Sequence, residues 1–322
     1  SRGSNEYLCS ILLGFGQMAM MTGYVGSSNV LESVLRSVNS RDPERIDAHA
    51  GYYGQSMIYG TYTIANLFTP TLVVLLGSKK MLVLGSSLFT LYLVSFFYLN
   101  SFSFYACAGL MGVGYAIFYS GHGAYLTEHS SRESVERNSA LVLASACWSL
   151  IVGGTVLLIS SLLSEPPKEQ TIAASAKVYR DFSGNEIIIM FACFSAISLV
   201  SNVLFAFLPS KIGSDSLVYT SPKPRLPFTK SIALMFSTLL HPRLLLLSLY
   251  FLTLGLFNGF VLGIYPTSFA FTKSLSSYRY LPAAAMVMVG TGDVLMGLVL
   301  SFLSRRVRNF GLVHALVIGL SL

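Results

Sequence analysis

One acidic residue lies deep within a long apolar stretch of the sequence. Asp293 is the single acid or base between Tyr280 and Ser304. A carboxylate inside a membrane costs about 2.5–3.5 kcal/mol on insertion scales, so it normally faces a protein interior or a water-filled cavity. Asp293 therefore fits an ion- or proton-coupling group or a gate. The alternative is a structural acid, whose partner must come from another helix because Arg305 lies about 18 Å further along its own helix.

A histidine occupies a second apolar run. His122 has Tyr119 three residues before it and Tyr125 three residues after it, which places all three side chains on one helix face. This arrangement fits either a protonatable group on a transport pathway or an interhelical hydrogen bond. Glu128 and His129 follow at the end of the run and are expected to be solvated.

Other chemistries are not supported. The sequence contains no set of nucleophile, base and acid, no cluster of metal ligands and no phosphate-binding loop. The cysteines lie in apolar runs without a CxxC motif or a neighbouring histidine, so we expect them to be packing residues. An enzyme, a cofactor and a metal site are therefore not expected.

The composition predicts a membrane protein. The 322 residues are 53% hydrophobic and 11% charged, whereas a soluble domain is about 25% charged. So few charges cannot cover the surface of a soluble chain, which excludes an ordinary cytosolic enzyme, a disordered segment and a coiled coil. The net charge is +7, but the basic residues form short clusters between apolar runs, so a nucleic-acid surface is not expected.

Stretches without charged residues define the expected helices. A transmembrane helix needs about 20 apolar residues, and continuously apolar runs of this length exclude the alternating strands of a β-barrel. A polar turn at residues 100–103 divides the longest run into two spans. Asp42-Pro43-Glu44 resembles a helix start and is expected to lead into the second span. The eight expected spans are residues 7–31, 50–78, two within 81–127, 138–164, 187–210, 244–272 and 280–304, with an incomplete ninth at 309–322.

The loops predict orientation and domain boundaries. The side that holds the N-terminus carries 13 of the 21 Lys and Arg residues, which predicts a cytoplasmic N-terminus. The longest polar stretch, residues 209–242, contains three prolines within residues 222–227 and four of these basic residues, and a fifth, Arg243, follows it directly. We expect it to be a cytoplasmic linker between an N-terminal six-helix bundle, residues 1–208, and the start of a C-terminal bundle, residues 243–322.

Several short motifs occur in a recognisable order. They are Gly51-Tyr52-Tyr53, GHGAYLTE at residues 121–128, GLFNGF at 255–260 followed by GIYPT at 263–267, and GDVLMG at 292–297 followed by Ser304-Arg305-Arg306. In order and spacing they resemble the Unc-ninety-three-like family, the ion channel regulatory branch of the major facilitator superfamily. The resemblance runs through almost the whole chain. Two departures are the sequence at residues 119–123 and the reduced loop Gly77-Ser78-Lys79-Lys80 after the second span.

The resemblance implies an all-α polytopic membrane protein with the major facilitator fold. That fold has twelve helices, so this chain is expected to be truncated after about eight and a half of them. Because spans one, four and seven line the central cavity in the superfamily, the resemblance implies cavity roles for Gln17, His122 and Asn258. Asp293, in the eighth span, is the further coupling candidate. Interhelical hydrogen bonds are the alternative role for these amides and for Gln55 and Asn66. The gating or topology candidates are Lys79, Lys80, Arg305 and Arg306.

Glycines in the seventh span allow two interpretations. Gly255, Gly259 and Gly263 form two overlapping GxxxG steps on one face, which favours close helix packing. The alternative is a flexible gating point near Pro266.

Two functional classes remain open. The first is a secondary transporter of an unidentified small solute, which works by rocking two bundles around a central site. The second is a non-transporting regulator or chaperone of membrane channels or receptors. The expected partners are the lipid bilayer and either a small solute or another membrane protein. A transporter is slightly favoured, because the fold is built around a cavity.

Overall fold

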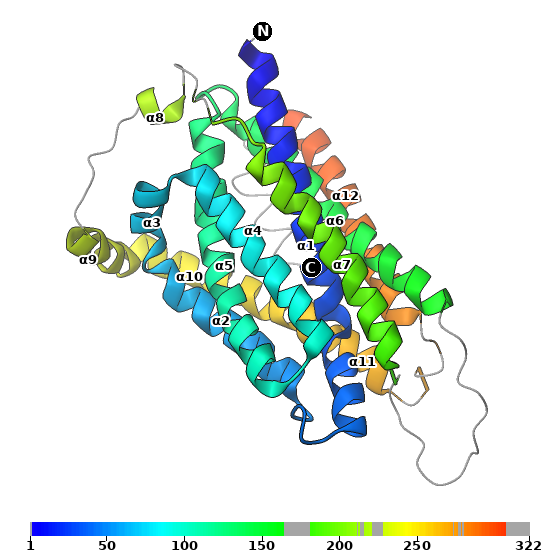
Figure 1. Cartoon of the computed structure of the whole chain (residues 1–322). Helices are drawn as coiled ribbons and strands as arrows, with labels where there is room; N and C mark the ends of the chain where they lie inside the picture. The colour runs from blue at the N-terminus through cyan, green and yellow to red at the C-terminus, as the bar shows by residue number, and fades with distance from the viewer. Residues whose placement is uncertain are drawn as a thin grey trace.

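The protein is all-α. A computed structural model describes residues 2–163, 181–210, 212, 216–220, 228–272, 274, 275, 278 and 280–306, and no strand occurs among them (Figure 1). The first seven helices are α1 (Arg2–Arg41), α2 (Ala50–Asn66), α3 (Thr69–Leu76), α4 (Ser78–Val94), α5 (Ser101–Glu128), α6 (Val135–Leu163) and α7 (Gly184–Ala206). The later helices are α8 (Leu217–Thr220), α9 (Phe228–Leu239), α10 (Pro242–Gly259), α11 (Tyr265–Phe271) and α12 (Leu281–Arg306). Two short segments complete the set, the 3-10 helix η1 (Ser95–Tyr98) and the π-helix η2 (Phe260–Ile264).

The eight predicted spans coincide with helices. Among the described residues, six helices are long and apolar enough to cross a membrane, and the pair α2 and α3, bent by 67°, makes a seventh span. The apolar part of α12, Leu281–Met296, lies at the eighth predicted position but is shorter. The prediction of an all-α polytopic membrane protein is therefore confirmed. The ninth predicted run lies outside the described residues.

Local signals explain several helix boundaries. The predicted polar turn separates η1 from α5, and Asn100 caps α5 by accepting a 2.9 Å hydrogen bond from the backbone N–H of Ser103. Gly77 separates α3 from α4 with a φ of 78°, a backbone conformation that glycine adopts without a steric penalty. The expected helix start at Asp42 is wrong. α1 continues to Arg41, residues 42–49 form turns, and α2 begins at Ala50.

α1 lies at the centre of the packed helices. It contacts α6 and α7 extensively, and it also contacts α2 and α4 (Figure 1). Glycines permit these close approaches, because a Cβ atom at Gly26 would lie 2.5 Å from the ring of Phe194. Between η1 and α7, the rings of Phe96 and Phe191 stack at a centroid separation of 3.9 Å. The core is therefore a set of aromatic side chains packed around the small residues of α1.

Two helices of the second half pack against the first. α12 lies along α6, where a Cβ at Gly154 would lie 3.0 Å from the carbonyl oxygen of Ala283, and α11 contacts α1 (Figure 1). We call these contacts of α1 and α6 with α11 and α12 the seam. By contrast, a Cβ at Gly255, Gly259 or Gly263 would meet no described atom within 4 Å. The described residues therefore supply no packing partner for the GxxxG stripe, whereas η2 lies directly before Pro266.

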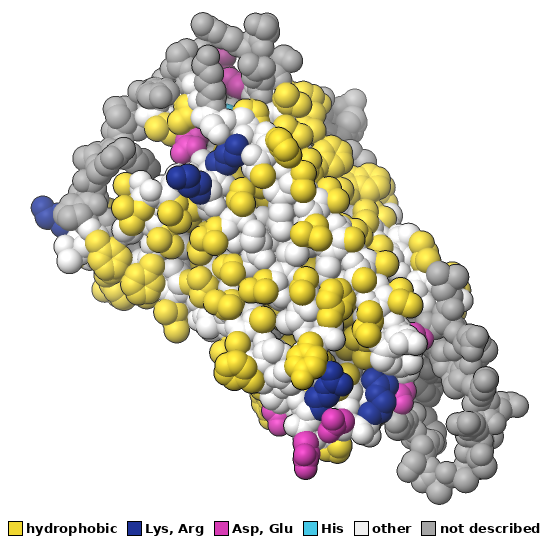
Figure 2. Space-filling view, in the orientation of Figure 1, with side chains coloured by type: hydrophobic (Ala, Val, Ile, Leu, Met, Phe, Trp, Pro, Cys, Tyr) yellow, Lys and Arg dark blue, Asp and Glu magenta, His cyan; other side chains and the backbone are white. Residues whose placement is uncertain are grey.

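The molecular surface has the layout of a membrane protein. Figure 2 shows hydrophobic side chains spread over the middle of the visible face, with charged side chains gathered toward its two ends. The exposed apolar residues include Leu84, Leu91 and Leu110 on α4 and α5 and Leu249 and Phe251 on α10. Such a broad apolar surface is expected where side chains face lipid rather than water.

Candidate functional site

Two of the predicted cavity residues lie together inside the first seven helices. Gln17 of α1 is buried and His122 of α5 is partly buried. Tyr119 lies between them, because its ring lies 6.3 Å from that of His122 and its hydroxyl interacts with the Gln17 side chain. The Oε1 atom of Gln17 and the Nε2 atom of His122 are both buried, and neither has a hydrogen-bond partner among the described residues. These two atoms therefore retain hydrogen-bonding capacity that a solute or water can use.

A column of tyrosines extends from this pair. Its members, here called the tyrosine column, are Tyr24, Tyr59, Tyr62, Tyr115 and Tyr119. The ring of Tyr115 lies 5.1 Å from that of Tyr119, 5.7 Å from that of Tyr24 and 4.9 Å from that of Tyr62. Helical spacing produces the column, since Tyr115 and Tyr119 are four residues apart on α5 and Tyr59 and Tyr62 are three apart on α2.

Polar contacts continue the column between α1 and α2. The hydroxyl of Tyr24 donates to Oε1 of Gln55 at 3.3 Å, and the Gln55 amide donates to the Ser28 hydroxyl at 3.0 Å. The hydroxyl of Tyr59 is an electrostatic neighbour of the Tyr24 hydroxyl. Gln55 thus has the interhelical hydrogen bonds that the sequence offered as its alternative role. The arrangement presents hydroxyl and amide groups, and its described members include no acid or base other than His122.

The other two cavity candidates lie apart from the column. Asn258 on α10 is exposed and donates to the carbonyl oxygen of Leu254 at 2.9 Å in its own helix. Asp293 on α12 is also exposed, and it interacts electrostatically with Cys147 of α6 across the seam. The structure therefore brings Gln17 and His122 together but does not bring Asn258 or Asp293 to them.

The predicted gating residues lie at helix ends. Lys79 is half-buried and Lys80 is exposed in the first turn of α4, directly after Gly77. Next to them the Ser78 hydroxyl donates to a carboxylate oxygen of Glu128, which ties α4 to the end of α5. Arg305 and Arg306 end α12, and their side chains lie outside the described residues.

The expectation that His129 is solvated is wrong. Its ring is buried and stacks on the ring of Tyr125 with 3.9 Å between centroids. Helix α5 ends at Glu128, so the chain folds His129 back onto the last turn. Stacking on an aromatic ring offsets the loss of hydration at this position.

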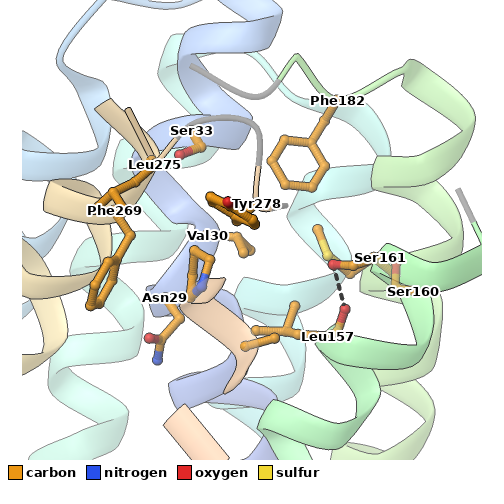
Figure 3. Close-up of a pocket in the computed structure, with 14 residues that line it drawn as sticks. Asn29, Val30, Ser33, Leu157, Ser160, Ser161, Phe182, Phe269, Leu275 and Tyr278 are labelled. Carbon is orange, nitrogen blue, oxygen red and sulfur yellow. Dashed lines mark hydrogen bonds between the residues drawn. The ribbon is translucent and has the colours of Figure 1, made fainter. Parts of the chain in front are cut away.

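A pocket at the seam was not predicted from the sequence. Figure 3 shows its labelled side chains converging from α1, α6 and α11, from the segment just before α7 and from the connection between α11 and α12. The hollow is partly open to solvent, and none of the described side chains that line it is charged. The polar members of the lining are Asn29, Ser33, Ser160, Ser161 and Tyr278. A second pocket shares Asn29, Phe269 and Pro282 with it, so the two hollows follow one seam.

A buried carboxylate also escaped prediction. Glu32 of α1 is 4% exposed, and its nearest charged partner is His49, whose Nδ1 atom lies 3.6 Å from Oε1. The sequence suggested that the first span ends at Glu32. The overlooked signal is the apolar spacing of Leu31, Val34, Leu35 and Val38, which continues the buried face of the helix past Glu32.

Metal chemistry receives no support from the described part of the chain. Among those residues, no group of three or more His, Cys, Asp or Glu side chains could hold a metal ion. The four cysteines, Cys9, Cys107, Cys147 and Cys193, are all free.

Comparisons with known proteins identify relatives along almost the whole chain. UNC93-like protein MFSD11 of Xenopus tropicalis is 25% identical over 308 residues, which cover 91% of this chain and 65% of the relative. The Xenopus laevis protein of the same name is 25% identical over 334 residues, or 98% of this chain and 70% of the relative. Protein unc-93 homolog A of Bos taurus is 21% identical over 320 residues, covering 92% and 67% of the two chains. This chain thus spans about two thirds of the length of these relatives.

The family model described as ion channel regulatory protein UNC-93 matches residues 42–322. These residues include all the short motifs from which the resemblance was inferred, from Gly51-Tyr52-Tyr53 to GDVLMG at residues 292–297. The chain therefore belongs to the UNC-93 family of multi-pass membrane proteins.

Proposed function

We propose that the protein is a secondary transporter of a small solute. The observation that carries this proposal is the tyrosine column, which ends at two buried polar atoms without partners on Gln17 and His122. Uncharged hydroxyl and amide groups bind a polar but neutral solute through hydrogen bonds and offer little to a strongly charged one. A protein that acts only through its surface has no need of such a column in its interior.

The seam supports movement between two bundles. We assign residues 1–208 to an N-terminal bundle and residues 243–322 to a second one, connected by the linker 209–242 on the cytoplasmic side. Alternating access in such folds is rocking of one bundle against the other around a fixed site. The hollows at the seam and the π-helix η2 provide the adjustable contacts that this motion requires.

The alternative function is regulation of a membrane channel or receptor. The description of the matched family, ion channel regulatory protein, favours it directly. The apolar surface of α10, whose described side chains are almost all exposed, offers a face on which another membrane protein could pack. A regulator of this kind needs the surface and does not need solute flux.

Solute flux in proteoliposomes separates these functions. The full-length protein is reconstituted and screened against a panel of neutral and zwitterionic solutes, with and without a pH gradient. We expect the wild type to accumulate at least one solute, and Asp293→Asn to abolish accumulation driven by the gradient while the folded yield stays normal. Asp42→Asn is the matched control, because Asp42 is an exposed acid between α1 and α2.

The outcomes are distinct. Wild-type flux that Asp293→Asn leaves unchanged at every pH contradicts a coupling role for Asp293. A wild type that moves no solute in the panel, yet co-purifies with a channel or receptor, overturns transport and supports regulation.

A further inference from the structure

The carboxylate of Glu32 is built into the protein interior. Both carboxylate oxygens are buried, and no described residue meets hydrogen-bond geometry with either of them. The 3.6 Å between Oε1 and Nδ1 of His49 exceeds hydrogen-bond length. A buried charge is costly unless it is paired and hydrogen-bonded, and binding a proton removes that charge. We propose that Glu32 is a proton-binding site that exchanges its proton with water through His49.

The neighbouring helix is shaped to admit this carboxylate. A Cβ atom at Gly51 of α2 would overlap Oε2 of Glu32 and lie 2.9 Å from the Glu32 Cα atom. Glycine is therefore the residue that lets α2 approach the acid so closely. This contact gives a physical reason for the glycine of the Gly51-Tyr52-Tyr53 motif.

His49 provides a route between the carboxylate and the aqueous phase. Its side chain is 55% exposed, whereas that of Glu32 is 4% exposed. An imidazole is a common proton shuttle in proteins. A proton taken up from the aqueous phase by the ring passes to the Glu32 carboxylate, which leaves a neutral carboxylic acid and a neutral imidazole.

The remaining groups around the site are few. On α1, Arg36 lies one turn beyond Glu32, and its guanidinium lies 5.1 Å from the ring centroid of Phe271. From α5, Tyr105 faces the site and donates a 3.0 Å hydrogen bond to the carboxylate of Asp47, which precedes α2. The facing residues of α11, Thr267 and Phe271, are uncharged. His49 and Arg36 thus supply the positive charge beside Glu32.

Two contacts connect this site to α11 across the seam. The Tyr52 hydroxyl, next to Gly51, donates to the Thr267 hydroxyl at 3.2 Å, and Arg36 covers the Phe271 ring. A change of charge at Glu32 therefore acts on the residues that hold α11 against α1 and α2. Use of this proton in coupled transport rests on the proposed function, whereas proton binding itself does not.

Infrared spectroscopy of the purified full-length protein tests the proposal. The carbonyl band of a protonated carboxyl group is followed while the pH is changed. The titration is repeated with choline in place of Na⁺, which distinguishes proton binding from Na⁺ binding at the carboxylate. We expect a titrating band that Glu32→Gln removes and that the change of cation leaves in place. Glu44→Gln, at an exposed glutamate just after α1, is the matched control and should retain the band.

Two further variants keep the test decisive if Glu32→Gln does not fold. His49→Gln changes an exposed side chain, and Gly51→Ala crowds Oε2 while keeping the carboxylate, so each should displace the midpoint of the band. A spectrum that is the same in wild type and Glu32→Gln, or a titration that depends on Na⁺, overturns the proposal. A Glu32-dependent band without solute flux supports the proton site and contradicts transport. Solute flux that keeps its pH dependence in Glu32→Gln contradicts the use of the Glu32 proton in coupled transport.

Discussion

Helices α1 and α10 are both apolar enough to cross a membrane, yet they occupy opposite environments. In the most apolar segments of these two spans, 72% of the α1 residues are buried against 0% for the span Pro242–Phe271. The mean hydropathies are 1.4 and 2.0, so the less apolar helix is the buried one. Since lipid is as apolar as leucine, hydrophobicity alone does not draw a helix into the interior of a membrane protein.

Small residues account for the difference. In α1, Cβ atoms at Gly16, Gly23 and Gly26 would collide with side chains of α7 and α4. In α10, Gly255 and Gly259 lie on one helix face, but Cβ atoms there would meet no described atom within 4 Å. Glycine spacing therefore identifies helices that are able to pack closely, and a neighbouring helix with matching side chains is needed as well.

Removal of an aromatic ring should show the largest difference in stability between the buried helix α1 and the exposed helix α10. Phe194 is fully buried against α1, and Phe251 of α10 is 54% exposed. We expect Phe194→Ala to reduce the free energy of unfolding by about 3–5 kcal/mol, because it leaves a cavity, and Phe251→Ala to have a much smaller effect. Thermal unfolding in the same detergent measures both. Equal losses would mean that α10 is as well packed as α1.

Addition of a methyl group should act with opposite signs in the two helices. Gly26→Ala places a Cβ 2.5 Å from the Phe194 ring and should destabilise the protein by about 1–3 kcal/mol through overpacking. Gly255→Ala meets open space and should stabilise α10 by up to about 1 kcal/mol, because alanine is the better helix former. The melting temperatures of the two variants should lie on either side of the wild-type value. Destabilisation by Gly255→Ala would reveal a packing partner for the stripe.

Loss of a single tyrosine hydroxyl should give the smallest difference in stability between α1 and α10. Tyr24→Phe removes the donor to Gln55 and should cost about 1 kcal/mol, because a buried amide oxygen loses its partner. Tyr250→Phe on α10 is the control, since the Tyr250 hydroxyl makes no hydrogen bond with the described residues, and it should leave stability unchanged. The melting temperatures of wild type and the two variants measure the difference. A loss as large as that of Phe194→Ala would show that the tyrosine column is cooperative.

The positions of the helices follow directly from the sequence, but their ends do not. Charged residues mark where a chain leaves the membrane, and the polar turn at Asn100 marks where α5 begins. The same rule fails at Glu32, because α1 continues as a buried helix to Arg41. It also fails at His129, where stacking on Tyr125 decides burial. Both failures concern polar residues whose environment comes from a neighbouring ring or helix.

The candidate site was predictable only in part. Gln17 and His122 are polar residues in apolar runs, so the sequence identified them, and the structure joins them through Tyr119. The rest of the column was missed because tyrosine is common in apolar helices and its hydroxyl gives no separate signal. The roles of Asn258 and Asp293 depend on contacts that the described residues do not contain.

The π-helix between α10 and α11 sets the rotational phase of the chain beyond it. A π turn holds more residues than an α turn, so η2 rotates α11 by roughly one residue position, about 100°, relative to an uninterrupted helix. This rotation turns Thr267 and Phe271 toward α1 and α2 while most of α10 faces outward. Removal of one residue within 260–264 would restore a continuous α-helix and turn both side chains away. Length in this segment, more than residue identity, therefore determines whether α11 closes the seam.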